Sequence, residues 1–232
     1  MVEFMKVILA SASPRRQELL QQVGWELEVR VAPFTEAKTT MELASLLQAG
    51  EPSWLAACHQ GKPLQSAEAL VAYNACGKAA AVQKQLAQLA ASAGIPAGVV
   101  AAGTTVPIVA ADTVVVRQER IMGKPADAQD AVRMLTDLAD GWHQVLTGVA
   151  VLYRQRQTVQ VVSTAVHFRK LSTAEITAYV ATGEPLDKAG AYGIQGRAAL
   201  FCDRIEGSYD NVVGLPLAAL DVQVRQIMES KN

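Results

Sequence analysis

The sequence predicts an α/β fold built on an elongated mixed β-sheet, and two observations carry this prediction. Near the N-terminus of the 232-residue chain, the apolar run 7–10 leads into a helix that starts at Pro14, which is the pattern of a βα unit. In the middle of the chain, segments 142–153 and 158–168 have the composition of two long strands joined by a short turn. A chain with both kinds of unit is expected to form a mixed sheet flanked by helices.

The other elements are predicted by the same kinds of pattern. Strands are expected where apolar and β-branched residues alternate or run together, at 26–32, 106–111, 114–116 and 201–205. Segment 117–122 is expected to form a hairpin tip and a returning strand. Helices are expected where apolar residues recur at helical spacing, at 41–47, 66–93, 127–138, 174–181 and 217–228. Capping side chains support two of these helices, with Asp127 before one and Ser172 or Thr173 before the other. Segment 207–211 is expected to be a turn.

Composition narrows the class of protein. Half of the residues are hydrophobic, which is ample for a buried core, and the formal net charge of −1 provides no basic field for nucleic acid. The three cysteines are scattered and lack the spacing of zinc ligands. The sequence shows no targeting pattern and no apolar run of membrane-spanning length. We therefore expect a cytoplasmic protein that binds neither a nucleic acid polymer nor a membrane, and the sequence leaves open whether it forms a homodimer.

Two arginines occupy the first turn of the helix that is predicted to start at Pro14. Arg15 and Arg16 lie at the positive pole of the helix dipole, which costs about 0.3–1 kcal/mol for each cation. A bound anion removes this conflict, because free backbone N–H groups, the hydroxyls of Ser11 and Ser13 and both guanidinium groups would converge on it. The alternative is a pair of solvated arginines on a surface helix.

Asp112 interrupts an otherwise apolar run. A buried carboxylate without partners is costly, so Asp112 is expected to be paired, metal-bound or at the exposed end of a strand, and the alternative is an aspartate that bonds its own backbone in a turn. Glu36 follows the end of a predicted strand, Lys78 lies on a helix, and Lys124 lies between a glycine and a proline. Each of these three taken alone is compatible with an ordinary solvated side chain.

Together these side chains indicate a reaction class. Four basic groups and two carboxylates are placed at strand ends, in loops or on helices, and they are Arg15, Arg16, Lys78, Lys124, Glu36 and Asp112. Carboxylates are the ligands that Mg²⁺ and Mn²⁺ prefer, and basic groups neutralise the charge on phosphates. This set of side chains therefore predicts metal-assisted chemistry on a polyphosphate.

The segment 190–196 is rich in glycine. Three glycines in seven residues permit close backbone approach, and their spacing matches neither the Rossmann nor the Walker fingerprint. We expect this segment to form a wall around a planar ligand, with Tyr192 available for stacking and Gln195 for hydrogen bonds to the ligand edge.

The sequence resembles the Maf family of nucleoside triphosphate pyrophosphatases in seven blocks that occur in order along nearly the whole chain. The blocks are LASASPRRQELL at 9–20, NA and KA at 74–79, ADTVV at 111–115, GKP at 123–125, G with H and TGV at 141–149, AYGIQG at 191–196, and GSY with NVVGLP at 207–216. The resemblance implies a single Maf-like domain over 1–232, with two lobes, a central cleft and a fold similar to that of inosine-triphosphate pyrophosphatases. It also implies cleavage between the α- and β-phosphates, to a nucleoside monophosphate and pyrophosphate, with a divalent cation.

The resemblance assigns roles residue by residue. It implies that Asp112 is the general base and that Asp112 and Glu36 hold Mg²⁺ or Mn²⁺. The residues that it places at the phosphates are Ser11, Arg16, Lys78 and Lys124. The residues that it places at the base, in the branch that acts on dTTP and UTP, are Arg15, Thr113 and Gln195. The alternatives are a nucleotide-binding regulator of cell division with little turnover, and the same reaction on 7-methyl-GTP or another non-standard nucleotide.

Two segments depart from the family pattern. Residues 37–66 separate Glu36 from the lysine-bearing helix by more than is usual in the family, and the connector 94–106 is also longer. We expect both to be insertions that reshape access, alter specificity or support oligomerisation.

Overall fold

The computed structural model describes residues 5–48, 66–95 and 104–230 of the chain. Its strands are β1 (Lys6–Leu9), β2 (Glu26–Val29), β3 (Ile108–Arg117), β4 (Arg120–Met122), β5 (Gly141–Tyr153), β6 (Arg156–Phe168) and β7 (Cys202–Glu206). Its α-helices are α1 (Pro14–Gln22), α2 (Thr40–Gln48), α3 (Ala67–Ser92), α5 (Ala128–Leu138), α6 (Thr173–Val180), α7 (Tyr209–Val213) and α8 (Leu217–Glu229). Three short 3₁₀ helices connect α6 with β7, and they are η1 (Glu184–Asp187), η2 (Ala189–Ala191) and η3 (Arg197–Leu200).

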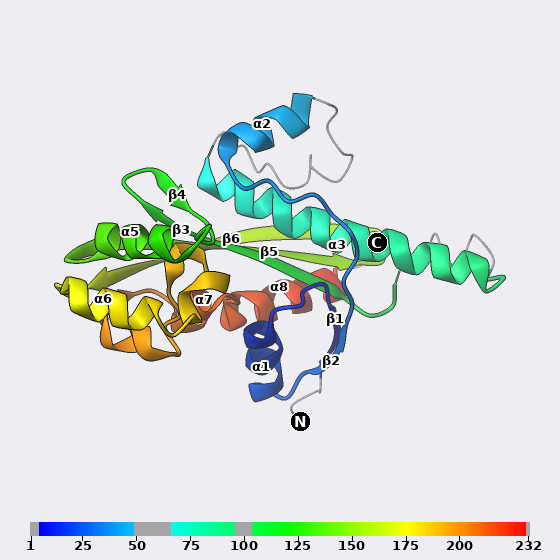
Figure 1. Cartoon of the computed structure of the whole chain (residues 1–232). Coiled ribbons are helices and arrows are strands. Elements are labelled where there is room, and N and C mark those ends of the chain that lie inside the picture. The colour runs from blue at the N-terminus through cyan, green and yellow to red at the C-terminus, as the bar shows by residue number, and fades with distance from the viewer. Residues whose placement is uncertain (1–4, 49–65, 96–103, 231–232) are drawn as a thin grey trace.

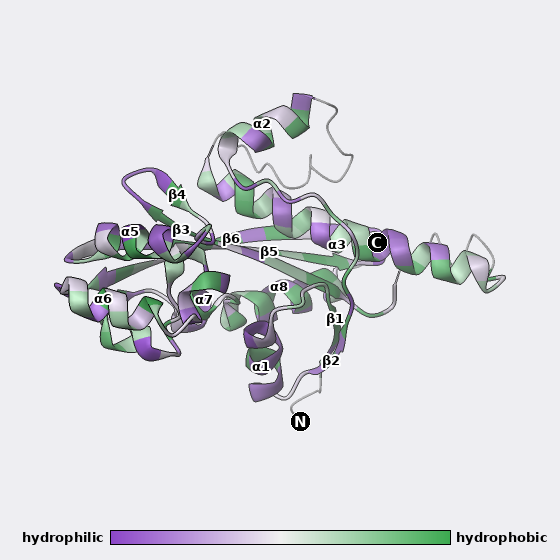
Figure 2. Cartoon of the chain, viewed as in Figure 1, coloured by the Kyte–Doolittle hydropathy of each residue, from purple (hydrophilic) through white to green (hydrophobic). Residues whose placement is uncertain are grey.

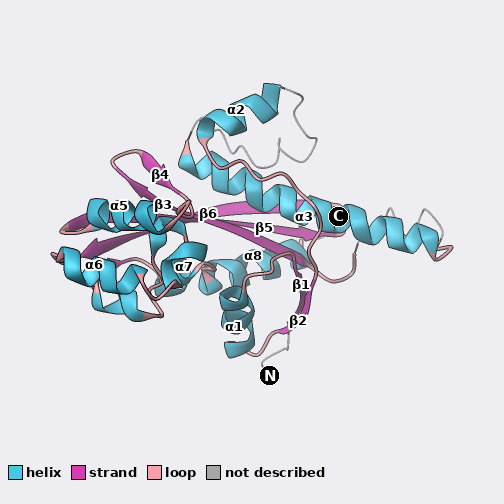
Figure 3. Cartoon of the chain, viewed as in Figure 1, coloured by secondary structure: helices cyan, strands magenta, loops and turns pink. Residues whose placement is uncertain are grey.

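Within the described residues, the strands form one seven-stranded mixed sheet. The order is β2-β1-β3-β5-β6-β7, and the short β4 pairs with β3 beside β1. Strand β1 is parallel to β2 and β3, whereas the pairs β3–β4, β3–β5, β5–β6 and β6–β7 are antiparallel. Figure 3 shows this sheet running through the molecule with helices around it. The expected α/β fold with an elongated mixed sheet is confirmed.

Helices cover both faces of the sheet. On the face that we call the α3 face, α2 and α3 pack on a core that includes Leu43, Val71 and Ala110. On the opposite face, called the α1 face, helices α1, α5, α6, α7 and α8 pack on a second core. Figure 1 shows α3 lying along the sheet on one side while α1, α7 and α8 lie on the other. The hydropathy colours of Figure 2 agree, since the central strands are mainly hydrophobic and α1 is mainly hydrophilic.

One glycine sets how closely α3 approaches the sheet. A Cβ at Gly148 of β5 would lie 2.5 Å from the carbonyl oxygen of Val71 in α3, so only glycine leaves room for the helix backbone there. Gly148 pairs with Asp112 across the strands, and both therefore point to the α3 face. The close approach brings the side chains of α3 within reach of Asp112.

The edge of β3 is open where the site residues gather. Strand β1 pairs with β3 only at Ile108 and Val109, and β4 pairs only with 115–117. Within the described part of the chain, no strand pairs with residues 110–114 on that side. The gap is flanked by the loop that leaves β1 and by the loop that leaves β4. It exposes the backbone around Asp112 to both loops.

The structure corrects two local predictions. Segment 207–211 was expected to be a turn, but Ser208 caps the short helix α7 there, with its hydroxyl accepting a hydrogen bond from Asn211 N–H. Asp112 lies inside a continuous strand with regular pairing, so the alternatives of a turn aspartate and of a strand end are wrong.

The two predicted insertions lie partly outside the described residues. The described part of 37–66 holds helix α2, in agreement with the expected helix at 41–47, and buries Ala37 and Leu43. Residues 49–65 and 96–103 lie outside the described residues, and the assignment of both segments as insertions stays a prediction. Among the described helices, none combines the length and apolar character that crossing a bilayer requires.

Candidate active site

An ammonium group between two carboxylates forms the centre of the site on the α3 face. Lys78 Nζ lies 2.7 Å from Asp112 Oδ1 and 3.2 Å from Glu36 Oε2. The side chains of Lys78 and Asp112 are 17% and 13% exposed, whereas that of Glu36 is 50% exposed. The cluster is therefore shielded from water at one end and open at the other, which strengthens the charge interactions at the Lys78–Asp112 end. Three residues predicted from sequence are thus in direct contact.

Asn74 holds Asp112 from the interior. Its Nδ2 donates to Asp112 Oδ2 at 2.9 Å and to the carbonyl oxygen of Ala37 at 2.8 Å, and its Oδ1 accepts from Ala37 N–H at 2.9 Å. Asn74 and Lys78 are four residues apart, so both project from one side of α3. Each oxygen of Asp112 accordingly accepts a hydrogen bond from this helix.

Arg16 occupies the α1 face. Its guanidinium donates to Ser11 Oγ at 3.1 Å, to Thr113 Oγ1 at 3.1 Å and to the carbonyl oxygen of Gly214 at 2.9 Å. Burial lowers the pKa of the Arg16 guanidinium below its usual value, and the nearby Asp112 carboxylate opposes that shift. Thr113, which is 97 residues from Arg16 in the sequence, is therefore brought next to the Ser11–Arg16 pair.

The N-terminus of α1 has the features of an anion site. Pro14 is at the first helical position, and the side chain of Ser13 makes no capping hydrogen bond. The Ser11 hydroxyl accepts from Ser13 N–H at 3.3 Å, so the loop after β1 folds back toward the helix start. First-turn N–H groups and an adjacent guanidinium are what a phosphate oxygen requires.

Arg15 points elsewhere than Arg16. Its guanidinium lies 3.3 Å from Asp187 of η1, so it ties α1 to the 3₁₀ segment that precedes the glycine-rich residues. Asp187 also accepts from Lys188 Nζ at 2.7 Å. The predicted role of Arg15 at the base stays a prediction.

Lys124 and Gln195 are exposed, and neither forms a hydrogen bond or ion pair with another described residue. Their placement follows from the strand register. Met122 is opposite Val115 in the antiparallel β3–β4 pair, so the chain beyond β4 runs back along the open edge of β3 toward Thr113. Gly190 N–H donates to the carbonyl oxygen of Gly123 at 3.0 Å, which joins the loop of Lys124 to the segment of Gln195. The roles of both residues stay predictions.

Two further polar residues extend the site on the α1 face, and the sequence reasoning missed them. Thr113 Oγ1 lies 3.0 Å from Thr147 Oγ1, and Thr147 in turn donates to the carbonyl oxygen of Asn211 at 3.2 Å. Thr147 pairs with Thr113 across β3 and β5, so a correct strand register would have identified it. Asn211 is fully buried. The only sequence signal for its role was its position in the family block 207–216.

The carboxylates suit a cation. Asp112 and Glu36 already hold the Lys78 ammonium group between them. Among the described residues no group of three or more His, Cys, Asp or Glu side chains could hold a metal ion. A two-carboxylate site fits Mg²⁺, which is usually bound by one or two carboxylates together with waters and substrate phosphate oxygens. The residues present therefore fit a metal that arrives with a polyphosphate.

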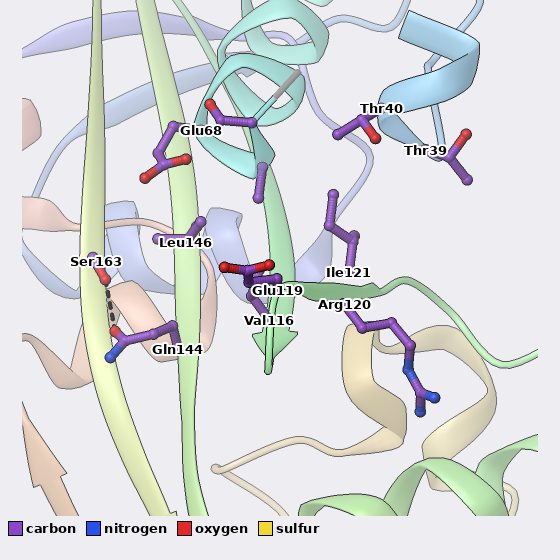
Figure 4. A pocket seen from close by; sticks show the side chains of 12 residues that line it. Thr39, Thr40, Glu68, Val116, Glu119, Arg120, Ile121, Gln144, Leu146 and Ser163 are labelled. Atoms are coloured by element: carbon purple, nitrogen blue, oxygen red, sulfur yellow. Dashed lines mark hydrogen bonds between the residues drawn. The ribbon is translucent and has the colours of Figure 1, made fainter. Parts of the chain in front are cut away.

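A separate cavity of about 710 Å³ opens at the N-terminal end of α3. Figure 4 shows Glu68, Glu119, Gln144 and Ser163 among the side chains around it. Val116 also lines the cavity and lies four residues along β3 from Asp112, which corresponds to roughly 13 Å of strand. None of the predicted site residues lines this cavity.

The prediction for Tyr192 is wrong. Tyr192 is 6% exposed, and its hydroxyl lies 2.9 Å from His143 Nε2 inside the α1-face core, with its ring against Phe168. Tyrosine is amphipathic, and its phenolic group finds a buried partner here instead of facing a ligand. Burial, together with the nearby Arg117 and His167, lowers the pKa of His143 to about 3, so this histidine is neutral and structural.

Comparison with known proteins identifies the family. The family model described as Maf-like protein matches residues 6–227. The chain is 41% identical over 215 residues to a dTTP/UTP pyrophosphatase of Gloeobacter violaceus, a match that covers 93% of this chain and 92% of the relative. It is 41% identical over 216 residues to a dTTP/UTP pyrophosphatase of Vibrio cholerae, covering 93% and 95%. For a dTTP/UTP pyrophosphatase of Photobacterium profundum the identity is 40% over 223 residues, covering 96% and 97%. The chain thus belongs to the Maf-like protein family.

Proposed function

We propose that this chain is a nucleoside triphosphate pyrophosphatase that hydrolyses dTTP and UTP to the monophosphate and pyrophosphate. The observation that carries the proposal is the Asp112–Lys78–Glu36 cluster beside the open edge of β3, with Arg16 on the other face of the same strand. Curated relatives of this name, at about 40% identity over nearly the whole chain, support it independently.

In the proposed reaction, Asp112 accepts a proton from the attacking water. The water oxygen bonds to the α-phosphorus, the bond from that phosphorus to the bridging oxygen breaks, and pyrophosphate leaves with that oxygen. Asp112 is suited to the base role because Lys78 and Asn74 hold its two oxygens in fixed directions. Lys78 also neutralises charge that develops on the phosphate oxygens.

Divalent metal is proposed as the cofactor, Mg²⁺ or Mn²⁺, held by Asp112 and Glu36. When bound it would polarise a phosphoryl oxygen and offset the negative charge of the triphosphate. This chain supplies further positive groups around the phosphates, namely Arg16 with Ser11 at the start of α1, and Lys124 from the loop after β4. A flexible lysine acts as a point charge, whereas the arginine fork fixes orientation.

Base selection is proposed to come from Gln195, Thr113 and Arg15. A pyrimidine edge such as that of thymine or uracil offers a carbonyl acceptor beside an N3–H donor, and one glutamine amide satisfies both. The nucleotide-binding regulator is the less favoured function, because a binding protein has no need of a held carboxylate between an amide and an ammonium group. We propose the cytoplasm, where nucleoside triphosphates are used, as the location.

The proposal is tested by pyrophosphate release from dTTP, UTP, 7-methyl-GTP and the other canonical triphosphates, with Mg²⁺ or Mn²⁺. We expect turnover of dTTP and UTP, and a loss of about 10²–10⁴-fold in kcat for Asp112→Asn, because the base is removed at nearly constant shape. Asp137→Asn is the matched control, since Asp137 is a surface carboxylate that pairs with Arg120.

Three results would contradict the proposal in different ways. Tight nucleotide binding without release would favour the regulator. Turnover confined to 7-methyl-GTP or another modified nucleotide would keep the reaction and overturn the substrate. Wild-type kcat in Asp112→Asn would remove Asp112 from the base role.

A further inference from the structure

The segment that carries Glu36 is docked on α3 at two points, one on each side of Glu36. We call residues 34–37 the strap. The Phe34 ring occupies the space over Gly77, where a Cβ would lie 2.0 Å from the ring, and its centroid lies 5.6 Å from that of Tyr73. At the other end, the backbone N–H and carbonyl of Ala37 both bond to the Asn74 amide, at 2.9 and 2.8 Å.

The Asn74 amide uses its donors and its acceptor for two different partners. Its Oδ1 and one N–H pair with the Ala37 backbone, and Nδ2 also bonds Asp112 at 2.9 Å. Asn74 is 2% exposed and Ala37 is 2% exposed, so water is excluded as a substitute partner. A buried amide with these contacts is strongly constrained, because losing either partner leaves polar groups without hydrogen bonds.

The consequence concerns the two carboxylates. Asp112 belongs to β3 and Glu36 to a segment outside the sheet, so no backbone ladder fixes their separation. Asn74 contacts Asp112 directly and contacts the residue next to Glu36, and Lys78 on the same side of the helix contacts both carboxylates. Both carboxylates are therefore positioned relative to helix α3.

We propose that Asn74 is a positioning residue that sets the separation of Glu36 and Asp112 by fixing the strap to β3. This inference rests on the proposed function for its kinetic consequence. Residues that hold metal-binding carboxylates in place typically affect metal affinity or activity by about 10- to 100-fold when they are replaced. In the proposed function, substrate binding rests on Arg16 and on the loop after β4, whereas the hydrogen bonds of the Asn74 side chain go to Ala37 and Asp112.

The test has one readout without nucleotide and one with it. Asn74→Leu keeps the side-chain size and removes every hydrogen bond. In the nucleotide-free protein we expect hydrogen–deuterium exchange of the strap amides, Ala37 above all, to become about tenfold faster or more. In turnover we expect kcat to fall by about 10- to 100-fold, with KM for dTTP within about threefold of wild type.

Gln223→Met is the matched control. Gln223 is another buried amide, and it donates to the carbonyl oxygen of Val149 at 3.3 Å and to Thr158 Oγ1 at 2.7 Å without contacting a site residue. We expect it to lower thermal stability while leaving strap exchange and kcat unchanged. Asn74→Ser is used if the leucine variant does not fold, because serine is polar but too short to reach both partners.

Unchanged strap exchange in Asn74→Leu, or unchanged kcat, would overturn the inference. An equal loss of kcat in Gln223→Met would also overturn it, since the effect would then be general to buried amides. A wild-type chain that releases no pyrophosphate would overturn the proposed function instead, and strap exchange, measured without nucleotide, would still decide whether Asn74 fixes the strap.

Discussion

The charged groups on the two faces of β3 have different partners. On the α3 face, the Lys78 ammonium lies between Asp112 and Glu36, so positive and negative groups compensate each other within the protein. On the α1 face, the neighbouring residue Thr113 begins a chain of neutral groups, and the Arg16 guanidinium at its end contacts only hydroxyl and carbonyl oxygens. Within the described residues, Arg16 forms no ion pair.

This difference separates two tasks around one strand. No carboxylate neutralises a cation that is partly buried among neutral oxygens, so its positive charge can attract an anion. Arg16 is therefore suited to hold a phosphate. The cluster of two carboxylates and one ammonium group has no excess of positive charge, so by itself it does not attract a phosphate. The cluster is suited to orient Asp112 as a base. When a metal ion and substrate bind, Lys78 can exchange its contacts with the carboxylates for contacts with the phosphates. In the proposed reaction, the α1 face of β3 would bind phosphate and the α3 face would carry out the chemistry.

Lys78→Met is the strongest way to break this arrangement. Without the ammonium group, Asp112 and Glu36 face each other without compensation, and the transition state loses a positive group. We expect kcat to fall by about 10²–10³-fold. Steady-state kinetics with dTTP measure the effect, and Lys84→Met, an exposed lysine on the same helix, is the control. Wild-type kcat in Lys78→Met would show that the cluster is only structural.

Arg16→Lys tests the binding face. Lysine keeps the charge but cannot reach Ser11, Thr113 and Gly214 with one planar fork. We expect KM for dTTP to rise by about 10- to 100-fold with a smaller change in kcat, the reverse of the pattern expected for Asn74→Leu. Arg133→Lys on the surface of α5 is the control. A large fall in kcat with unchanged KM would show that Arg16 acts in the reaction step.

The sequence predicted the elements well because each has a local signal. The apolar period of α5 and its Asp127 cap, and the long runs of strand-forming residues in β5 and β6, can each be recognised within their own segment. Helix α7 was missed because five residues between Ser208 and Gly214 are too short to show a period. Tyr192 was misplaced because an amphipathic side chain carries no signal for which of its partners is present.

The contacts of the site could not be predicted from local pattern. Lys78 and Asp112 are 34 residues apart, and their contact depends on the close approach of α3 at Gly148. The open edge of β3 depends on where β1 and β4 stop pairing, which is a property of three strands at once. The residue types at these positions indicated a polyphosphate site, whereas the meeting of the side chains in one place was implied only by the family resemblance. Thr147 was missed because its pairing with Thr113 depends on strand register, and Asn74 received no role because its contacts with Ala37 and Asp112 depend on how α3 packs on the sheet.

The smallest expected effect concerns His143, which is buried on the α1 face. Its pKa is lowered from 6.5 to about 3 by burial first, so the folded protein keeps it neutral where the unfolded chain takes up a proton. A lowered folded-state pKa means that stability is complete above pH 6.5 and is lost as the pH falls toward 3. Between pH 6.5 and pH 5 we expect this histidine to reduce the free energy of unfolding by about 1.5–2 kcal/mol.

His143→Gln isolates that contribution, because glutamine can bond the Tyr192 hydroxyl but does not titrate in this range. Urea unfolding of both proteins at pH 6.5 and pH 5 measures it. The other titrating groups act equally in both proteins, so the wild type should lose more stability than the variant by the amount above. Parallel losses would mean that His143 takes up a proton as readily in the folded protein as in the unfolded chain, so that burial does not keep it neutral.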